Sequence, residues 1–281
     1  MTDNVEITTL ANGLRVVSED MPRLQTASLG VWVDVGTRYE PAEVNGVAHM
    51  LEHMAFKGTE RRSARAIAEE IERVGGSLNA YTSREHTAYY ARILAGDVDL
   101  AADILADILQ HSAFDPEELE KERHVVLQEI GQVKDTPDDL VFDLLQEASY
   151  PDQPMGRAIL GPEEIVAAMP REALIDYMAR HYGPSRLVLA GAGIDAEQSA
   201  IGIGRVEAVN PVDQAPLLAN ALEQAGRHAA AQDRGKHLHL VDARVAVVGC
   251  VEVQDDVGLV ERLLLGGSPG GLWQRTLVCE T

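Results

Sequence analysis

Cysteine is scarce in this sequence, because its 281 residues include only Cys250 and Cys279. Two cysteines supply neither the several disulfides of a small secreted scaffold nor the thiolates of a four-cysteine zinc site. The sequence also lacks an apolar run of the ~18 residues that a membrane span requires. Its first residues lack the basic and apolar segments of a signal peptide. These absences predict a globular, cytoplasmic protein without a membrane span.

Positive charge is also in short supply. The chain has 24 Lys and Arg against 45 Asp and Glu, which gives a formal net charge of −21. Nucleic acids and anionic membranes favour basic surfaces, so neither is expected as a partner. The acidity favours a cationic ligand or peptide, although a role in solubility alone would also account for it. The length of 281 residues is ample for a buried core in one large domain or two ordinary ones.

Strand and helix signals alternate through the first two thirds of the chain. Asn12-Gly13 separates two alternating runs and predicts a β-hairpin. One helix is expected after Asn45-Gly46, a second from the cap residue Ser63, and a third from Asp115-Pro116. The spacing of apolar residues predicts the remaining elements, which are helices at 97–110, 140–148 and 171–181 and strands at 27–35, 78–81, 87–94 and 186–190.

The composition changes after about residue 195. Eleven of the twelve aromatic residues lie at or before Tyr182, and Trp273 is the one that follows. Residues 200–281 carry 7 Lys and Arg and 10 Asp and Glu, a net of 7 − 10 = −3, which leaves −18 for residues 1–199. Large side chains usually anchor a core. We therefore divide the chain into a domain at residues 1–195 and an atypical tail at residues 196–281.

The segment His49-Met50-Leu51-Glu52-His53 most directly indicates chemistry. Histidines four residues apart lie on one face of a helix, about one turn apart, so both imidazoles can bind one zinc ion. Glu52 lies on the same side at a spacing that suits a general base, which accepts a proton from water. The motif is the reverse of His-Glu-x-x-His and predicts the same chemistry.

Chance and a structural role are the two alternatives to this interpretation. With nine His and 25 Glu in 281 residues, a shuffled sequence would contain about 0.025 such matches. The structural alternative is an ion pair between Glu52 and a histidine on the helix surface. Four other histidines lack a partner at ligand spacing and are interpreted as structural or surface residues, namely His86, His111, His124 and His181.

A site with two histidines needs a third protein ligand, which is usually a carboxylate. The helix expected from Asp115 offers Glu122 and Glu129, seven residues apart and therefore on one face. One of them can bind the metal, while the other can hydrogen-bond to a metal ligand and so orient it without touching the metal. Glu118 lies on roughly the same stripe, so periodicity leaves the choice open, and a solvated acidic helix face is the alternative.

Four segments of the chain resemble, in order and spacing, the M16 metallopeptidases, and among these the processing-peptidase branch. They are residues 46–59, which contain the His-x-x-Glu-His motif, and residues 78–85, 122–129 and 156–162. The resemblance runs from about residue 5 to residue 195. It implies an α+β fold in which a mixed, largely antiparallel sheet is flanked by helices.

The same resemblance implies one zinc ion per chain and gives roles to individual residues. It also implies an edge strand that pairs with an extended substrate peptide, so that backbone bonds give affinity and side-chain pockets give selectivity. The implied site residues are the zinc ligands His49, His53 and Glu129, the general base Glu52, the supporting acid Glu122, and the substrate-strand residues Asn79, Ala80 and Tyr81.

The predicted function is that of a zinc-dependent endopeptidase for peptides or presequence-like segments, and the acidic charge suits cationic ones. The family builds its chamber from two similar domains per chain or subunit, but here the resemblance ends near residue 195. We therefore interpret residues 196–281 as part of a truncated or frame-disrupted second domain. A homo- or heterodimer with another M16-like chain or domain is expected.

The alternative function is that of a non-catalytic M16-like subunit, which would serve as a scaffold. Non-catalytic members of the family typically lose residues of the zinc motif, whereas this chain keeps them all, which favours the enzyme. The missing second domain favours the scaffold.

Limited proteolysis tests the division of the chain. Because the tail has few large side chains to anchor a core, we expect the first cuts beyond about residue 195 and a resistant fragment that binds zinc. Mass analysis of the early fragments identifies the cut sites. A tail that resists the protease as well as residues 1–195 do would show an integrated second domain and contradict this interpretation.

Overall fold

A six-stranded sheet is the centre of the computed structural model, which describes residues 5–194. The tail expected at 196–281 lies outside the described residues. The strands follow the spatial order β1-β2-β6-β3-β5-β4, and all neighbours are antiparallel except β2 and β6. The expected mixed, largely antiparallel sheet is thus confirmed. The strands are β1 Val5–Thr9, β2 Arg15–Glu19, β3 Thr26–Val33, β4 Ser77–Thr82, β5 Thr87–Leu94 and β6 Leu187–Ala192.

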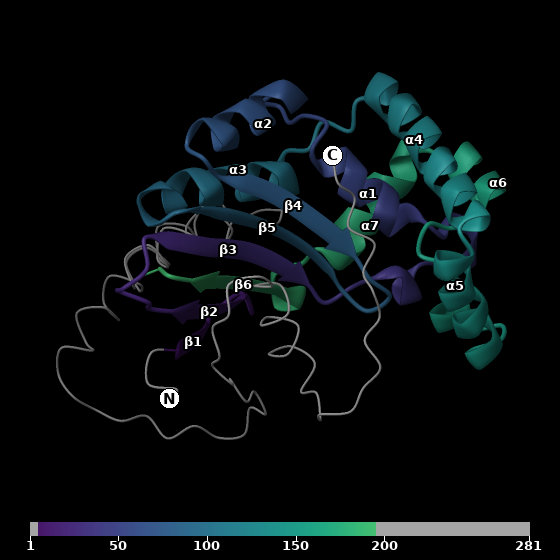
Figure 1. Cartoon of the computed structure of the whole chain (residues 1–281), viewed down its shortest axis with the longest axis horizontal. Coiled ribbons are helices and arrows are strands. Elements are labelled where there is room, and N and C mark those ends of the chain that lie inside the picture. The colour runs from purple at the N-terminus through teal and green to yellow at the C-terminus, as the bar shows by residue number, and fades with distance from the viewer. Residues whose placement is uncertain (1–4, 195–281) are drawn as a thin grey trace.

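Helices cover one face of this sheet (Figure 1). Helices α1, α2 and α3 pack against strands, α7 packs against α1, and α4 links α5 and α6 to α1 beyond the end of the sheet. None of the helices within residues 5–194 combines the length and hydropathy needed to cross a bilayer. The helices are α1 Val47–Ala55, α2 Ala64–Arg73, α3 Val98–Gln110, α4 Pro116–Asp135, α5 Pro137–Ser149, α6 Glu163–Ala168 and α7 Arg171–His181.

The local signals in the sequence account for most of these boundaries. Gly13 has a φ of 92° in the turn between β1 and β2, which a residue without a side chain adopts freely. The Ser63 hydroxyl accepts a hydrogen bond from the backbone of α2, and the Asp115 carboxylate accepts two from the first turn of α4. Helix α6 was not predicted, because its six residues are too few to show a helical period.

Helix α1 is buried on nearly all sides. Eight of its nine residues are buried, and Met50 and Met54 are fully enclosed in the main core between the helices and the sheet. A helix in this position cannot leave polar groups to water, so His49 and Glu52 need partners from neighbouring elements. The burial of α1 therefore makes the environment of the zinc motif a property of the whole fold.

The first turn of α1 is held by a carboxylate from outside the helix. Gly46, the residue before α1, has a φ of 98° and offers no side chain as a cap. Glu40 supplies the missing cap. Its carboxylate accepts hydrogen bonds from the backbone N–H groups of Gly46 at 2.9 Å and Ala48 at 2.8 Å, and from the Asn45 side chain at 2.7 Å. Burial raises the pKa of Glu40 to about 7, and these hydrogen bonds oppose that rise.

We expect Glu40→Gln to lower the free energy of unfolding by about 2 kcal/mol, because the new amide faces N–H donors where both carboxylate oxygens now accept. Denaturant unfolding of the metal-free protein measures this. Glu43→Gln is the matched control: Glu43 is exposed nearby and should change stability by less than about 0.5 kcal/mol. Equal effects of the two substitutions would contradict a capping role for Glu40.

Candidate metal centre

The two histidines of the motif and one glutamate of α4 converge on a single point. The rings of His49 and His53 have centroids 4.6 Å apart. The Oε2 atom of Glu129 lies 3.8 Å from Nε2 of His49 and 3.6 Å from Nε2 of His53. The candidate ligand atoms of these three residues all lie within 4.8 Å of one another. Glu118, the other acid on this stripe, instead pairs with Lys121 at 2.6 Å.

The donor set fits a zinc ion. Two ligand atoms at about 2.0–2.1 Å from a tetrahedral metal are ~3.4 Å apart, which is close to the observed separations. Burial, together with the charge of His53, lowers the pKa of His49 to about 3, so its imidazole is in the neutral form that binds metals. Two imidazoles and a carboxylate are typical of catalytic zinc sites, whereas structural sites rely on thiolates.

Glu122 stands behind the pair of histidines. Its Oε2 atom is 3.0 Å from Nδ1 of His53, and its Oε1 atom is 2.9 Å from the Lys57 ammonium. Burial alone would raise the pKa of Glu122, but the hydrogen bonds with His53 and Lys57 lower it below its usual value. An ionised Glu122 accepts the N–H of His53 and fixes the orientation of that imidazole, with Nε2 toward Glu129.

Glu52 lies beside the histidines and is 6% exposed. Its Oε2 atom accepts a 2.6 Å hydrogen bond from the hydroxyl of Thr82 on β4. Burial raises the pKa of Glu52 to about 7, while the hydrogen bond from Thr82 and the charge of His53 act in the opposite direction. A carboxyl group with a pKa near neutrality can take up a proton and give it back, as a general base requires.

The three predicted substrate-strand residues lie on β4, which is the last strand at one edge of the sheet. Helix α1 packs against this strand, so the edge lies close to the zinc motif. The side-chain oxygen of Asn79 accepts a 2.8 Å hydrogen bond from the N–H of Ala80. The side chain of Tyr81 is buried on the opposite face of the sheet, against Trp32.

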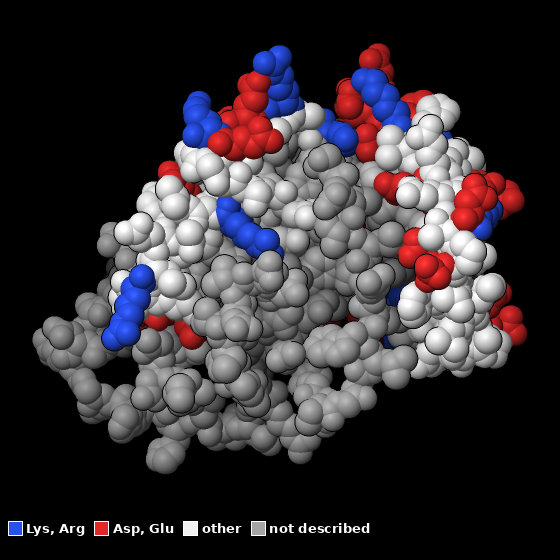
Figure 2. Space-filling view, in the orientation of Figure 1, with Lys and Arg blue, Asp and Glu red and all other residues white. Residues whose placement is uncertain are grey.

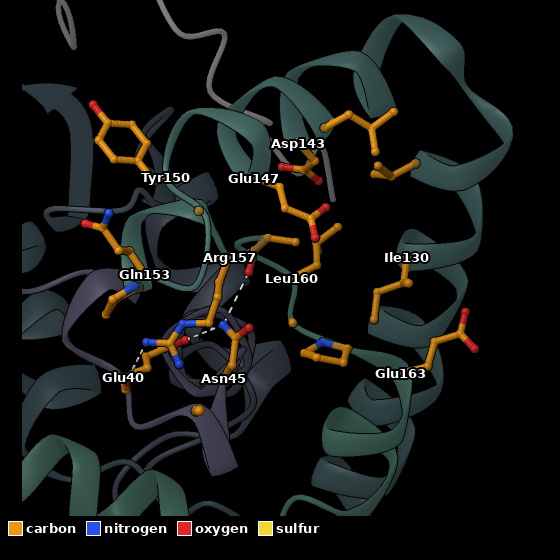
Figure 3. Close-up of a pocket in the computed structure, with 18 of the residues that line it drawn as sticks. Glu40, Asn45, Ile130, Asp143, Glu147, Tyr150, Gln153, Arg157, Leu160 and Glu163 are labelled. Carbon is orange, nitrogen blue, oxygen red and sulfur yellow. Dashed lines mark hydrogen bonds between the residues drawn. The ribbon is translucent and has the colours of Figure 1, made fainter.

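A large cavity lies near Asn45, which precedes α1, and extends between α4, α5 and the segment that follows α5 (Figure 3). Its volume is about 1030 Å³, and neither the two histidines nor Glu129 lines it. Arg157 and Asn45 meet at one end, where the Arg157 guanidinium donates a 2.7 Å hydrogen bond to the backbone carbonyl of Glu40. The carboxylates along the cavity belong to Glu40, Asp143, Glu147, Asp152, Glu163 and Glu164.

Comparison with known proteins agrees with this geometry. Residues 15–163 match the family model described as insulinase, peptidase family M16. The chain belongs to the M16 peptidase family. This places the His-x-x-Glu-His segment of α1 and the acids of α4 in a family of peptidases whose members include proteins named as zinc proteases.

Similar M16 proteins are found in plants and bacteria. The chain is 51% identical over 187 residues to a probable mitochondrial-processing peptidase subunit beta of Arabidopsis thaliana. It is 47% identical over 185 residues to the uncharacterized zinc protease YmxG of Bacillus subtilis. Each alignment covers 66% of this chain. The chain spans 35% and 45% of the length of these two relatives.

Solved M16-like structures share the fold. A protease from Helicobacter pylori superposes with a TM-score of 0.70 at 23% identity, covering 75% of this chain and 51% of that protein. Pitrilysin superposes with a TM-score of 0.65 at 26% identity, covering 76% of this chain and 24% of that protein. The arrangement of the sheet and helices is therefore the one seen in these proteases.

Sequence reasoning gave no role to three residues that the structure places around the motif. Glu40 caps α1, Lys57 pairs with Glu122, and Thr82 donates to Glu52. Lys57 and Thr82 lie in segments that resemble the family, yet their partners are 65 and 30 residues away in the chain. A single sequence gives no signal for such pairings, because they depend on how α1, α4 and β4 pack.

Competitive zinc titration tests the two roles on α4. Glu129→Gln should weaken zinc binding by more than about 100-fold because a ligand is lost, whereas Glu122→Gln should cost about 10-fold because His53 remains but is less well oriented. Glu118→Gln, on the same helix and paired with Lys121, is the control and should leave the affinity unchanged. A larger loss for Glu122→Gln than for Glu129→Gln would mean that the roles are exchanged.

Proposed function

We propose that the chain is a zinc-dependent endopeptidase. The observation that carries this proposal is the convergence of His49, His53 and Glu129 on one point with the buried carboxylate of Glu52 beside them. When bound, zinc supplies Lewis acidity at the scissile carbonyl and makes a nearby water easier to deprotonate. Glu52 takes the proton that this water loses and passes it to the departing amine.

The substrate in this proposal is an extended peptide that adds to the edge of β4. An edge strand presents unpaired backbone groups, which pair with the backbone of a peptide regardless of its sequence. On β4 the N–H of Ala80 is occupied by the side chain of Asn79, so an entering peptide would take the place of that side chain. Asn79 then becomes available to bond the peptide itself.

Basic peptides are the substrate class that the charges favour. Six carboxylate residues border the cavity next to α4, against two basic residues, Lys134 and Arg157. On the face shown in Figure 2, acidic side chains lie along the side formed by α4 and α5, whereas over α2 they are interspersed with Lys and Arg. A cationic peptide gains from this field both in its rate of encounter and in its affinity.

A second M16-like chain or domain is the proposed partner. Relatives of this chain, among them the one from Arabidopsis thaliana, are named as subunits of a mitochondrial-processing peptidase. In this proposal the partner completes the chamber around the peptide. In the alternative function, as a scaffold, the chain would bind zinc and a partner without cleaving peptides.

We expect Glu52→Gln to keep zinc bound and to lower kcat by about 10²–10⁴-fold, because the amide preserves the shape of the side chain but cannot take up the proton. The measurement is cleavage of an internally quenched basic peptide, with zinc content determined in parallel. Glu72→Gln, at an exposed position on α2, is the control and should behave as wild type.

Removal of zinc by a chelator should abolish the same cleavage, and added zinc should restore it. Stoichiometric zinc without chelator-sensitive cleavage, in the chain alone and with an M16-like partner, would reject the enzyme and support the scaffold. Wild-type turnover by Glu52→Gln would show that another group is the base.

A further inference from the structure

The last residue of β4 faces the zinc motif. Successive side chains of a strand point to opposite faces of the sheet. Ala80 belongs to the core under the helices, and Tyr81 belongs to the cluster on the opposite face. Thr82 therefore points back toward α1, where its hydroxyl lies 3.5 Å from the backbone carbonyl of Ala48. Directly across the strands, its partner in the register is Thr87 of β5.

The hydroxyl of Thr82 makes a short hydrogen bond to the base of the motif. Its Oγ1 atom donates to Oε2 of Glu52 over 2.6 Å, and both residues are 6% exposed. Within residues 5–194, no other hydrogen bond reaches this carboxylate. Thr82 thus holds one carboxylate oxygen and leaves the other, Oε1, available to accept a proton.

A buried glutamate needs such a contact to keep one orientation. The last torsion of a glutamate side chain is broad and close to two-fold, so the rotamer alone does not fix the plane of the carboxylate. A hydrogen bond to a charged acceptor is about twice as strong as a neutral one, and it is stronger still away from water. The contact with Thr82 is therefore sufficient to select one carboxylate orientation.

We propose that Thr82 is a positioning residue that orients Glu52 for proton transfer, an inference that rests on the proposed role of Glu52 as the general base. The hydroxyl itself exchanges no proton with the substrate. By fixing Oε2 it directs Oε1 to the position from which Glu52 reaches the water and then the departing amine. The loss of this contact should affect the chemical step and leave the binding of zinc and of the peptide intact.

Three variants of the 281-residue chain test this role, with an internally quenched basic peptide as the substrate. Thr82→Val keeps the β-branched shape without the hydroxyl and should lower kcat by about 10–100-fold. KM and zinc affinity should stay within about 2-fold of wild type. Thr82→Ser restores the hydroxyl and should recover kcat to within about 3-fold. Thr87→Val removes a neighbouring buried hydroxyl, which donates to Val35, and should leave kcat unchanged.

A second readout uses no metal and no activity. A double-mutant cycle combines Thr82→Val with Glu52→Leu in the zinc-free chain and follows denaturant unfolding. Thr82→Val should raise the unfolding equilibrium constant about 10-fold when Glu52 is present and less than about 3-fold when it is replaced. The control cycle with Thr87→Val should be additive.

The outcomes separate this inference from the proposed function. Wild-type protein without chelator-sensitive cleavage would overturn the proposed function, and the inference with it. Cleavage by the wild type together with an unchanged kcat for Thr82→Val would overturn the inference alone. Equal losses for Thr82→Ser and Thr82→Val, or additive effects in the Glu52 cycle, would likewise show that Thr82 acts through packing rather than through its hydroxyl.

Discussion

The packing of α1 against α4 is the contact on which the metal centre depends. Helix α1 carries both imidazoles and Glu52, the proposed base, while α4 carries the two carboxylates that meet the imidazoles. The paired residues His53 and Glu122 are 69 positions apart in the chain. The apolar residues Val126 and Ile130 of α4 belong to the same core as α1, so burial of apolar area holds the helices together. The polar groups then meet because they lie along the same helix faces.

Because the site is buried, the carboxylates of Glu40, Glu122 and Glu52 each need hydrogen-bond or ionic partners. The kind of partner differs with the role of each residue. Glu40 is surrounded by N–H donors and stabilises the start of α1. Glu122 is held between Lys57 and His53, which keeps its pKa low and its charge in place. Glu52 has a single hydroxyl as its donor, and burial raises its pKa. One fold thus keeps a fixed charge and a proton acceptor within the same small region.

The sequence predicted what depends on local chemistry. The caps Ser63 and Asp115, the hairpin at Gly13 and the pairing of histidines on one helix face all follow from short-range rules, and the structure agrees with them. The choice among the acids of α4 was open until the packing of α1 and α4 brought Glu129 rather than Glu118 to the histidines. Contacts such as those of Thr82 lay beyond prediction, since they join elements whose relative placement no local pattern encodes.

Strand β4 connects these features, because its outer backbone edge and its two side-chain faces each have a different role. Its outer edge is the proposed site for an extended peptide, the Thr82 side chain points inward to Glu52, and the Tyr81 side chain points to the far face. A slip of one residue in the pairing with β5 would exchange the two faces and remove Thr82 from Glu52. Tyr81 opposes such a slip, since its hydroxyl accepts a 3.3 Å hydrogen bond from the Trp32 indole and lies 3.1 Å from Nε2 of His86. The aromatic face of the sheet therefore secures the register on which the orientation of the base on the other face depends.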